Sequence, residues 1–346
     1  MSQRAIFFSF LRIHSAILLL HVCITAPMLL GNERPTQANY SVSTKNSEQD
    51  AENSAKEDRV WLLSTRQLVS RASQVNLEEP QFSVSLQTGE NRFQPVAVND
   101  FLDALHERKK AVVYVHGNRF TASDAIERGL LVYENVAKHS IQQPLDWIIW
   151  SWQSDKSGIL AHDARLKALR TEGQGLYLAW LLRQHTSRKI STTLVGYSFG
   201  GRVVTGALHA LAGGSLGGVS MGDKTIQGAP INTGLIAPAI DSLWLDDRGY
   251  HRLATQNMNR LTLLYNRRDA ILKRYWLIDR VQGRLALGYT GPRSFAPRAD
   301  GSTLPVISRD CSNAIGVKHD ELYYFQKSCN AGREIAKLIN EQPTFE

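Results

Sequence analysis

Residues 190–200 read Ile-Ser-Thr-Thr-Leu-Val-Gly-Tyr-Ser-Phe-Gly, and this stretch decides the fold. It joins an apolar run typical of a buried strand to the pattern Gly-x-Ser-x-Gly, and residues 202–211 then have the composition of an apolar helix. A serine between such a strand and helix stands on a sharp turn, and the flanking glycines let the strand and the helix approach without a clash. The stretch therefore predicts a nucleophile elbow at Ser198, with Gly196 and Gly200 as its structural glycines.

The rest of the chain alternates apolar runs with segments of helical spacing. The continuous apolar run at 111–115 indicates a strand buried on both faces of a sheet, and the stretch 145–150 indicates another buried strand. We expect further strands at 59–65, 81–86, 190–195, 225–230, 260–265 and 304–307, and helices at 123–137, 165–183, 202–211 and 333–339. This alternation predicts an α/β fold with a mostly parallel sheet, helices on both faces, and a site beyond the carboxyl ends of the strands.

Length and composition bound the protein class. A chain of 346 residues with 43% hydrophobic residues can form one large domain with its own core, which we assign to residues 59–346. The formal net charge of +8 would favour anionic substrates or an anionic surface, or simply reflects a solvated, arginine-rich exterior. Zinc-type Cys/His spacing and a basic-aromatic nucleic-acid motif are both absent, so we expect no metal, no cofactor and no nucleic-acid partner.

The N-terminal residues predict export. Arg4 and Arg12 precede an apolar run at 16–30, which is short for a membrane span and typical of the core of a signal peptide. We assign residues 1–31 to a signal peptide, or else to an uncleaved anchor that would hold the protein at a membrane. The polar residues 32–58 predict a disordered linker. The expected location is periplasmic or secreted.

Cysteine usage agrees with export. Cys23 lies in the expected signal, which leaves Cys311 and Cys329 as a pair in the mature chain. In an oxidising compartment these two residues can form a disulfide, and the closed loop would contain His319. The alternative is two free thiols.

A base for Ser198 is expected late in the chain. His319 follows the last expected strand, where an imidazole could relay the proton from the serine hydroxyl to a leaving group. Most of the other histidines lie in the export segment or within expected helices. His162 and His251 are the main rivals.

An acid is expected just beyond the strand at 260–265. Asp269 stands there, where a carboxylate could hold the tautomer of the imidazole, although it could instead form a salt bridge with a neighbouring arginine. The chain order Ser198, Asp269, His319 is that of the α/β hydrolases. The alternative acids are Asp246, Asp247 and Asp279.

An oxyanion hole requires two backbone N–H donors aimed at the developing negative charge. The residue after the nucleophile, Phe199, supplies one at the start of a helix. The turn after Gly117 would supply the other, most simply from Asn118, while His116 orients that loop. The alternative for His116-Gly117-Asn118 is a purely structural turn.

These residues resemble the α/β-hydrolase superfamily and, within it, a bacterial branch of unassigned substrate. The matching stretches, in order within residues 110–325, are 113–118, 150–154, 196–201, 228–230 and 266–272, together with His319. The resemblance implies an α/β-hydrolase fold of eight strands and a catalytic triad of Ser198, Asp269 and His319. Tyr197 departs from the pattern, because that branch often has histidine there, and we expect the change to affect packing rather than mechanism.

The predicted function is a serine hydrolase that cleaves a carboxylic ester, or a thioester or amide, through an acyl-enzyme. Its partner would be a small-molecule or acyl-ester substrate. Residues 231–259 would form a small cap that offers apolar surface to an acyl chain, or ordinary helices packed on the sheet. A non-catalytic binding protein with a hydrolase fold is one alternative, and a peptidase or acyltransferase with the same triad is another.

Overall fold

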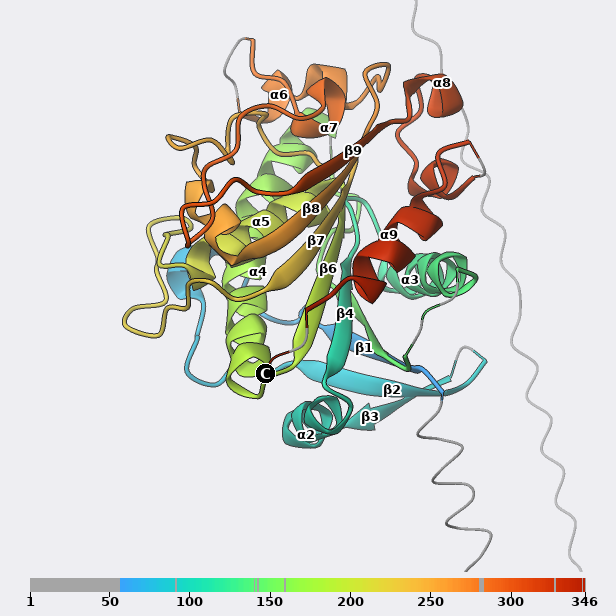
Figure 1. Cartoon of the computed structure of the whole chain (residues 1–346), viewed down its shortest axis with the longest axis vertical. Helices are drawn as coiled ribbons and strands as arrows, with labels where there is room; N and C mark the ends of the chain where they lie inside the picture. The colour runs from blue at the N-terminus through green and yellow to red at the C-terminus, as the bar shows by residue number, and fades with distance from the viewer. Residues whose placement is uncertain are drawn as a thin grey trace, which may run out of the picture. The chain divides into compact units, whose positions relative to one another are not determined.

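A nine-stranded sheet runs through the part of the chain that the computed structural model describes, which is residues 57–345 except 91, 140, 142, 159, 280–282, 327 and 344 (Figure 1). In the order in which they lie side by side, the strands are β3 (Arg92–Val96), β2 (Ser83–Gly89), β1 (Arg59–Ser64), β5 (Asp146–Ser151), β4 (Lys110–Val115), β6 (Ser191–Tyr197), β7 (Ile231–Ile236), β8 (Met258–Tyr265) and β9 (Val306–Asp310). The seven strands that lie side by side from β1 through β5, β4, β6, β7 and β8 to β9 are parallel. At the other edge, β2 pairs antiparallel with β1, and β3 pairs antiparallel with β2. The predicted α/β class and mostly parallel sheet are confirmed, with one strand more than the eight expected.

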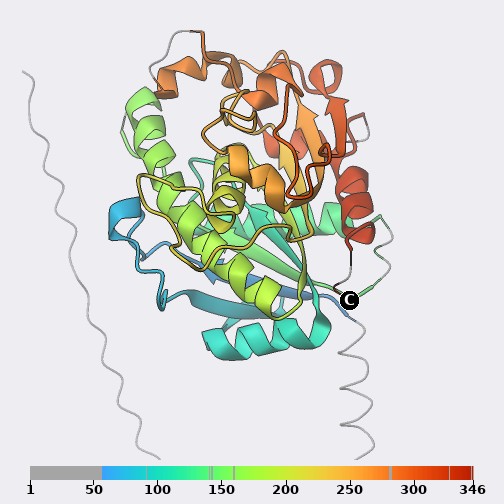
Figure 2. The ribbon, with the colours of Figure 1, turned by 60° about the vertical axis from the view of Figure 1, so that its left-hand side comes forward.

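Helices cover both faces of this sheet. On one face α4 (Leu160–Ser187) packs against α5 (Phe199–Leu211), and both contact β6, as Figure 2 shows in front of the sheet. On the other face α3 (Ala122–Ala137) packs against α9 (Ala331–Asn340). The remaining helices are α2 (Val98–Arg108), α6 (Trp276–Asp279), α7 (Leu287–Thr290), α8 (Ser312–Ile315), and the 3₁₀ turns η1 (Ala72–Gln74), η2 (Arg252–Asn257), η3 (Leu272–Arg274) and η4 (Glu321–Phe325).

Burial on both faces explains why the central strands are continuous apolar or β-branched runs. Every residue of β5, β6 and β7 is buried. Polar side chains reach solvent near the antiparallel edge of the sheet, where no residue of β3 is buried. The polar composition of β3 and α2 is the reason that the sequence did not predict them.

The strand expected at 225–230 is wrong, and so is the start of the expected cap. β7 forms six residues later, at Ile231–Ile236, inside the segment 231–259. Gly228 has a φ of 79° and Pro230 lacks an N–H, so residues 225–230 suit a turn rather than a central strand. Asn232 makes β7 look polar in sequence, but its side chain donates to the Leu338 carbonyl at 2.6 Å in the buried sheet. Beyond β7, turns and η2 pack on α5.

The expected export segment and the linker up to residue 56 lie outside the described residues. Within the described ranges, no helix combines the length and the apolar character needed to span a membrane.

Candidate active site

Ser198 lies on the turn between β6 and α5 with a φ of 52° and a ψ of −115°. A non-glycine residue adopts positive φ only when the surrounding structure holds it there, and such strain gathers at functional sites. The two flanking glycines are required for space rather than for φ. A Cβ atom at Gly200 would lie 2.0 Å from the Val115 carbonyl oxygen, and one at Gly196 would lie 2.8 Å from the Gly200 carbonyl oxygen. The structure therefore has the elbow geometry that the motif predicts.

Three side chains from different strand ends meet at this turn. His319 Nε2 lies 2.8 Å from Ser198 Oγ, and His319 Nδ1 lies 2.6 Å from Asp269 Oδ2. Asp269 is fully buried and Ser198 is 6% exposed. The structure thus brings together the serine, the histidine and the aspartate that the sequence singled out, in the relative order of nucleophile, base and orienting acid.

The Asp269 carboxylate is held in one orientation. Its second oxygen, Oδ1, accepts hydrogen bonds from the backbone N–H groups of Ile271 and Leu272, both at 2.9 Å. Because both oxygens are occupied, the carboxylate keeps Oδ2 on the ring of His319. An ionised carboxylate there favours a proton on Nδ1, which leaves Nε2 as an acceptor for the serine hydroxyl.

The loop that carries His319 is tied to the sheet on both sides. Before the histidine, Asn266 donates through Nδ2 to the Gly316 carbonyl at 2.8 Å. After it, Tyr114 on β4 donates through its hydroxyl to the buried carboxyl of Glu321, whose two oxygens both lie at 2.8 Å. Burial raises the pKa of Glu321 to about 8, so this carboxyl is protonated at neutral pH. The sequence reasoning did not find Glu321, because its partner lies 207 residues away in the chain.

Two further contacts restrain the same loop. The expected disulfide between Cys311 and Cys329 is present, with a Cα–Cα distance of 5.5 Å, and it encloses His319 in a loop of 18 residues' separation. Tyr197 stacks on the imidazole of His319, with ring centroids 5.4 Å apart. Tyr197 thus packs directly on the expected base, a contact that depends on how the loop of His319 closes.

His116 is a fully buried, neutral imidazole that holds the loop after β4. Its Nδ1 donates to the Gly117 carbonyl at 2.8 Å, and its Nε2 accepts from the Trp152 backbone N–H at 3.2 Å. Burial lowers the pKa of His116 to about 3, so it stays uncharged. The ring also stacks on Phe120 and Trp152. This histidine has no contact with Ser198 that would make it a base.

The backbone N–H groups of Asn118 and Phe199 are available at the site. Both residues line the same cavity as Ser198. Within the described part of the chain, no hydrogen bond uses either N–H group. The Asn118 side chain instead accepts from the Arg119 N–H at 2.9 Å, which fixes the turn.

Ser198 opens into a cavity of about 570 Å³ with mostly apolar walls. α4 contributes Ala161 and Ala164, and the segment after Asp269 contributes Leu272, Tyr275 and Ile278. Of the segment expected to form a cap, only Ala239 reaches this cavity. The largest share of the walls therefore comes from residues 271–278, and the rest comes mainly from the loop 118–120, the elbow and α4.

The rival residues lie elsewhere. His251 is buried and hydrogen-bonded to Thr205, and His162 is exposed on α4. Asp246 lines a second cavity, Asp247 is exposed, and the side chain of Asp279 is outside the described part of the structure. Among the described residues, no group of three or more His, Cys, Asp or Glu side chains is placed to hold a metal ion.

The sheet topology and the elbow define an α/β-hydrolase fold. No protein-family model matches the chain, and no curated protein matches it. Among solved structures, the chain is similar to a C6-C4 SN3-inhibited esterase B from Lactobacillus rhamnosis, with 12% sequence identity and a TM-score of 0.37. That match covers 86% of this chain and 92% of the other. Function therefore has to be derived from the residues of the site.

Proposed function

We propose that this protein is a serine hydrolase that cleaves carboxylic esters through an acyl-enzyme. The observation that carries the proposal is the unbroken hydrogen-bond chain from Asp269 through His319 to Ser198, which ends on a serine oxygen at an apolar cavity. A non-catalytic binding protein has no need of a strained serine aligned with an imidazole and a buried carboxylate.

The reaction begins when Ser198 Oγ attacks the ester carbonyl carbon and His319 Nε2 takes the hydroxyl proton. The tetrahedral intermediate collapses as the C–O bond to the alcohol breaks, and His319 returns the proton to the departing alkoxide. Water then repeats both steps on the acyl-enzyme, which releases the carboxylic acid and restores Ser198. Asp269 stabilises the imidazolium in each half-reaction and stays ionised.

The N–H groups of Asn118 and Phe199 would hold the carbonyl oxygen as its negative charge develops. A single donor of this kind contributes on the order of 10²- to 10³-fold in kcat. Their fixed backbone positions, at a restrained turn and at the first residue of α5, require no reorganisation during the reaction.

The cavity supports an ester with an apolar acyl group. Its volume of about 570 Å³ falls in the range of small-molecule sites, and its side chains offer dispersion contacts rather than hydrogen bonds to a peptide backbone. A peptidase or an acyltransferase would use the same three residues, so a panel of esters, thioesters and amides with graded acyl length discriminates among them.

We also propose that the protein works outside the cytoplasm. Support comes from the disulfide between Cys311 and Cys329, since such bonds persist in oxidising compartments. A thiol count on unreduced protein recovered from the exported fraction tests this, and two free thiols at these positions would contradict it.

Labelling with a fluorophosphonate probe tests the catalytic proposal. The wild-type chain is expected to form a covalent adduct at Ser198, and Ser198→Ala is expected to take no label. Labelling that persists in Ser198→Ala would move the nucleophile elsewhere. A folded wild-type chain that takes no label would overturn the proposal.

A further inference from the structure

Large hydrophobic side chains stand exposed on two segments that also contribute residues to the walls of the Ser198 cavity. Ile271 is 52% exposed, Trp276 is 44% exposed and Val317 is 61% exposed. The two segments that carry them lie side by side, because the Ala270 N–H donates to the Val317 carbonyl at 3.1 Å. An exposed apolar cluster beside a cavity indicates an interaction site rather than chance exposure.

Residues 271–278 expose some side chains to solvent and direct others into the cavity. Between the exposed positions, Leu272 and Tyr275 are buried and line the cavity, and Ile271 is both exposed and part of its lining. Apolar side chains of this segment thus reach from the outer surface into the cavity of Ser198, whose walls also include Arg119 and Arg274. A ligand that is itself apolar could follow these side chains into the cavity.

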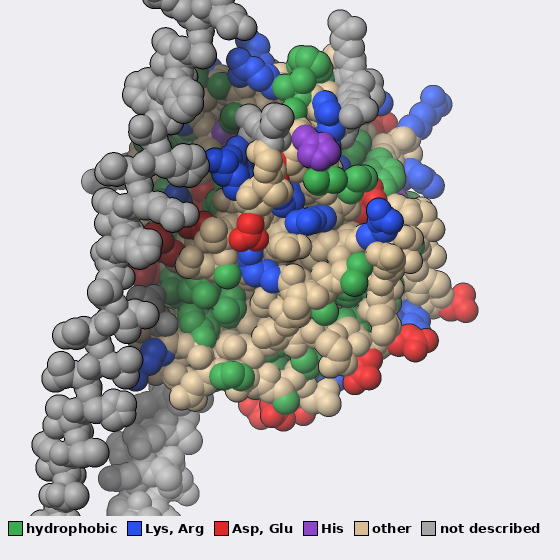
Figure 3. Space-filling view, turned by 180° about the vertical axis from the view of Figure 1, so that it is seen from behind, with side chains coloured by type: hydrophobic (Ala, Val, Ile, Leu, Met, Phe, Trp, Pro, Cys, Tyr) green, Lys and Arg blue, Asp and Glu red, His purple; other side chains and the backbone are tan. Residues whose placement is uncertain are grey.

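Basic side chains alternate with the exposed hydrophobic ones. Arg268, Lys273 and Lys318 are all exposed, and within the described residues no salt bridge joins any of them to an acid. Nearby carboxylates are engaged elsewhere, since Asp269 faces His319 and Asp320 pairs with Arg128. Seen from behind, lysine and arginine side chains lie among hydrophobic ones along the upper edge of the molecule (Figure 3). We call Arg268, Ile271, Lys273, Trp276, Val317 and Lys318 the rim.

Interleaved cations and exposed apolar groups match one kind of surface. The core of a protein–protein interface is depleted of lysine, whereas the rim carries its lysine and arginine side chains among its apolar groups. An anionic lipid surface attracts lysine and arginine side chains, and tryptophan and isoleucine insert at the boundary between headgroups and acyl chains.

We propose that the rim docks on an anionic lipid membrane and that the substrate is an acyl ester lipid drawn from it. The substrate clause rests on the proposed esterase function, while the docking clause does not. Docking would place the cavity mouth on the bilayer, so that an acyl chain passes along Ile271 towards Ser198.

Vesicle co-sedimentation of the full chain tests the docking. Ser198→Ala is the common background, so that no lipid is consumed. We expect binding to vesicles of phosphatidylglycerol and phosphatidylcholine, weaker binding at high salt, and little binding to phosphatidylcholine alone. Arg268→Glu combined with Lys273→Glu is expected to weaken binding about tenfold or more, and Trp276→Ser about tenfold.

Lys224→Glu and Leu243→Ser are control variants, because both residues are exposed and neither lines the Ser198 cavity. If the rim variants bound vesicles as tightly as these controls, the docking proposal would be overturned. Binding of that kind is the result expected if the N-terminal segment alone holds the chain on lipid. Equal binding to neutral vesicles would overturn the docking proposal too. Fluorophosphonate labelling of the chain with Ser198 intact tests the esterase function separately. If binding depended on the rim but Ser198 took no label, the docking proposal would stand and the proposed lipid substrate would be overturned.

Discussion

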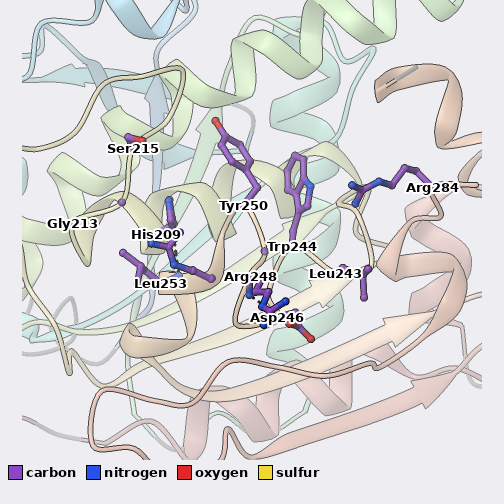
Figure 4. Close-up of a pocket in the computed structure, with 13 residues that line it drawn as sticks. His209, Gly213, Ser215, Leu243, Trp244, Asp246, Arg248, Tyr250, Leu253 and Arg284 are labelled. Atoms are coloured by element: carbon purple, nitrogen blue, oxygen red, sulfur yellow. Dashed lines mark hydrogen bonds between the residues drawn. The ribbon is translucent and has the colours of Figure 1, made fainter. Parts of the chain in front are cut away.

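The cavity at Ser198 and the second cavity, which Asp246 lines, differ in the hydrogen-bond partners of their polar side chains. The second cavity, of about 830 Å³, is larger than that at Ser198 and carries several charged and aromatic groups (Figure 4). Its members include His209, Ser215, Trp244, Asp246, Arg248, Tyr250, Arg252 and Arg284. Size and charge alone would therefore point to the second cavity rather than to the one at Ser198.

Two polar side chains of the second cavity are bonded to neighbouring groups of the protein. His209 Nδ1 accepts from the Leu253 N–H at 3.3 Å, and Arg284 pairs with the buried Asp241 at 2.9 Å. Within the described residues, no hydrogen bond joins His209 to Ser215. At the smaller cavity, by contrast, the bonds converge on one serine oxygen. A reactive site is recognised by that convergence and by the strain that supports it.

Replacing the serine in each cavity gives the largest expected contrast. Ser198→Ala should lower kcat for a p-nitrophenyl ester by about 10⁶-fold, because loss of the nucleophile leaves only binding and oxyanion stabilisation. Ser215→Ala, in the second cavity, should leave turnover within about twofold of wild type, since surface changes away from a site have small effects. A comparable loss in both variants would remove the distinction between the two cavities.

Replacing an acid in each cavity should give a smaller contrast. Asp269→Asn keeps the shape of the side chain but favours the wrong tautomer of His319, and a loss of about 10⁴-fold in kcat is expected. Asp246→Asn in the second cavity should change kcat little. Thermal melting of both variants checks that each is folded. If Asp269→Asn kept wild-type turnover, the carboxylate would be structural.

The disulfide restrains the loop of His319 at the Ser198 cavity, and it should contribute to the free energy of unfolding. Joint replacement of Cys311 and Cys329 by alanine should lower the free energy of unfolding by about 3 kcal/mol, because the unfolded chain regains the entropy of the loop. The variant should also lose turnover, since the loop holds His319. Urea unfolding with and without reductant measures the effect. An unfolding curve unchanged by reductant in wild type would show that the bond contributes nothing to stability.

Local sequence signals located the elbow, the loop at His116 and the residues that meet at Ser198. Each lies at the end of a strand whose apolar run is visible in a short window, and chain order in a parallel sheet brings such ends together. Contacts between distant segments were not visible in this way. The Tyr114–Glu321 hydrogen bond and the burial of Asn232 in β7 depend on partners over 100 residues away. The stacking of Tyr197 on His319 likewise depends on how the loop closes.

Buried titratable groups near the two cavities should respond to pH in opposite directions, and this is the smallest expected effect. Glu321, which holds the His319 loop, has its pKa raised to about 8 from 4.5, so the folded state keeps a proton that the unfolded state loses. Its contribution to stability therefore falls as the pH rises from about 5 to 7, by about 2–3 kcal/mol. Glu321→Gln should remove that slope in urea unfolding measured at each pH.

His209, in the second cavity, has its pKa lowered by burial to about 4 from 6.5. The unfolded state then binds a proton that the folded state refuses, so stability falls as the pH drops from about 6.5 to 5, by about 2 kcal/mol. His209→Gln should remove a rise of stability with pH between about 4 and 6.5, whereas Glu321→Gln should remove a fall of stability with pH between about 4.5 and 8, so the two substitutions change the slope in opposite directions where these ranges overlap. If both variants changed the slope in the same direction, the contrast between the two cavities would not hold.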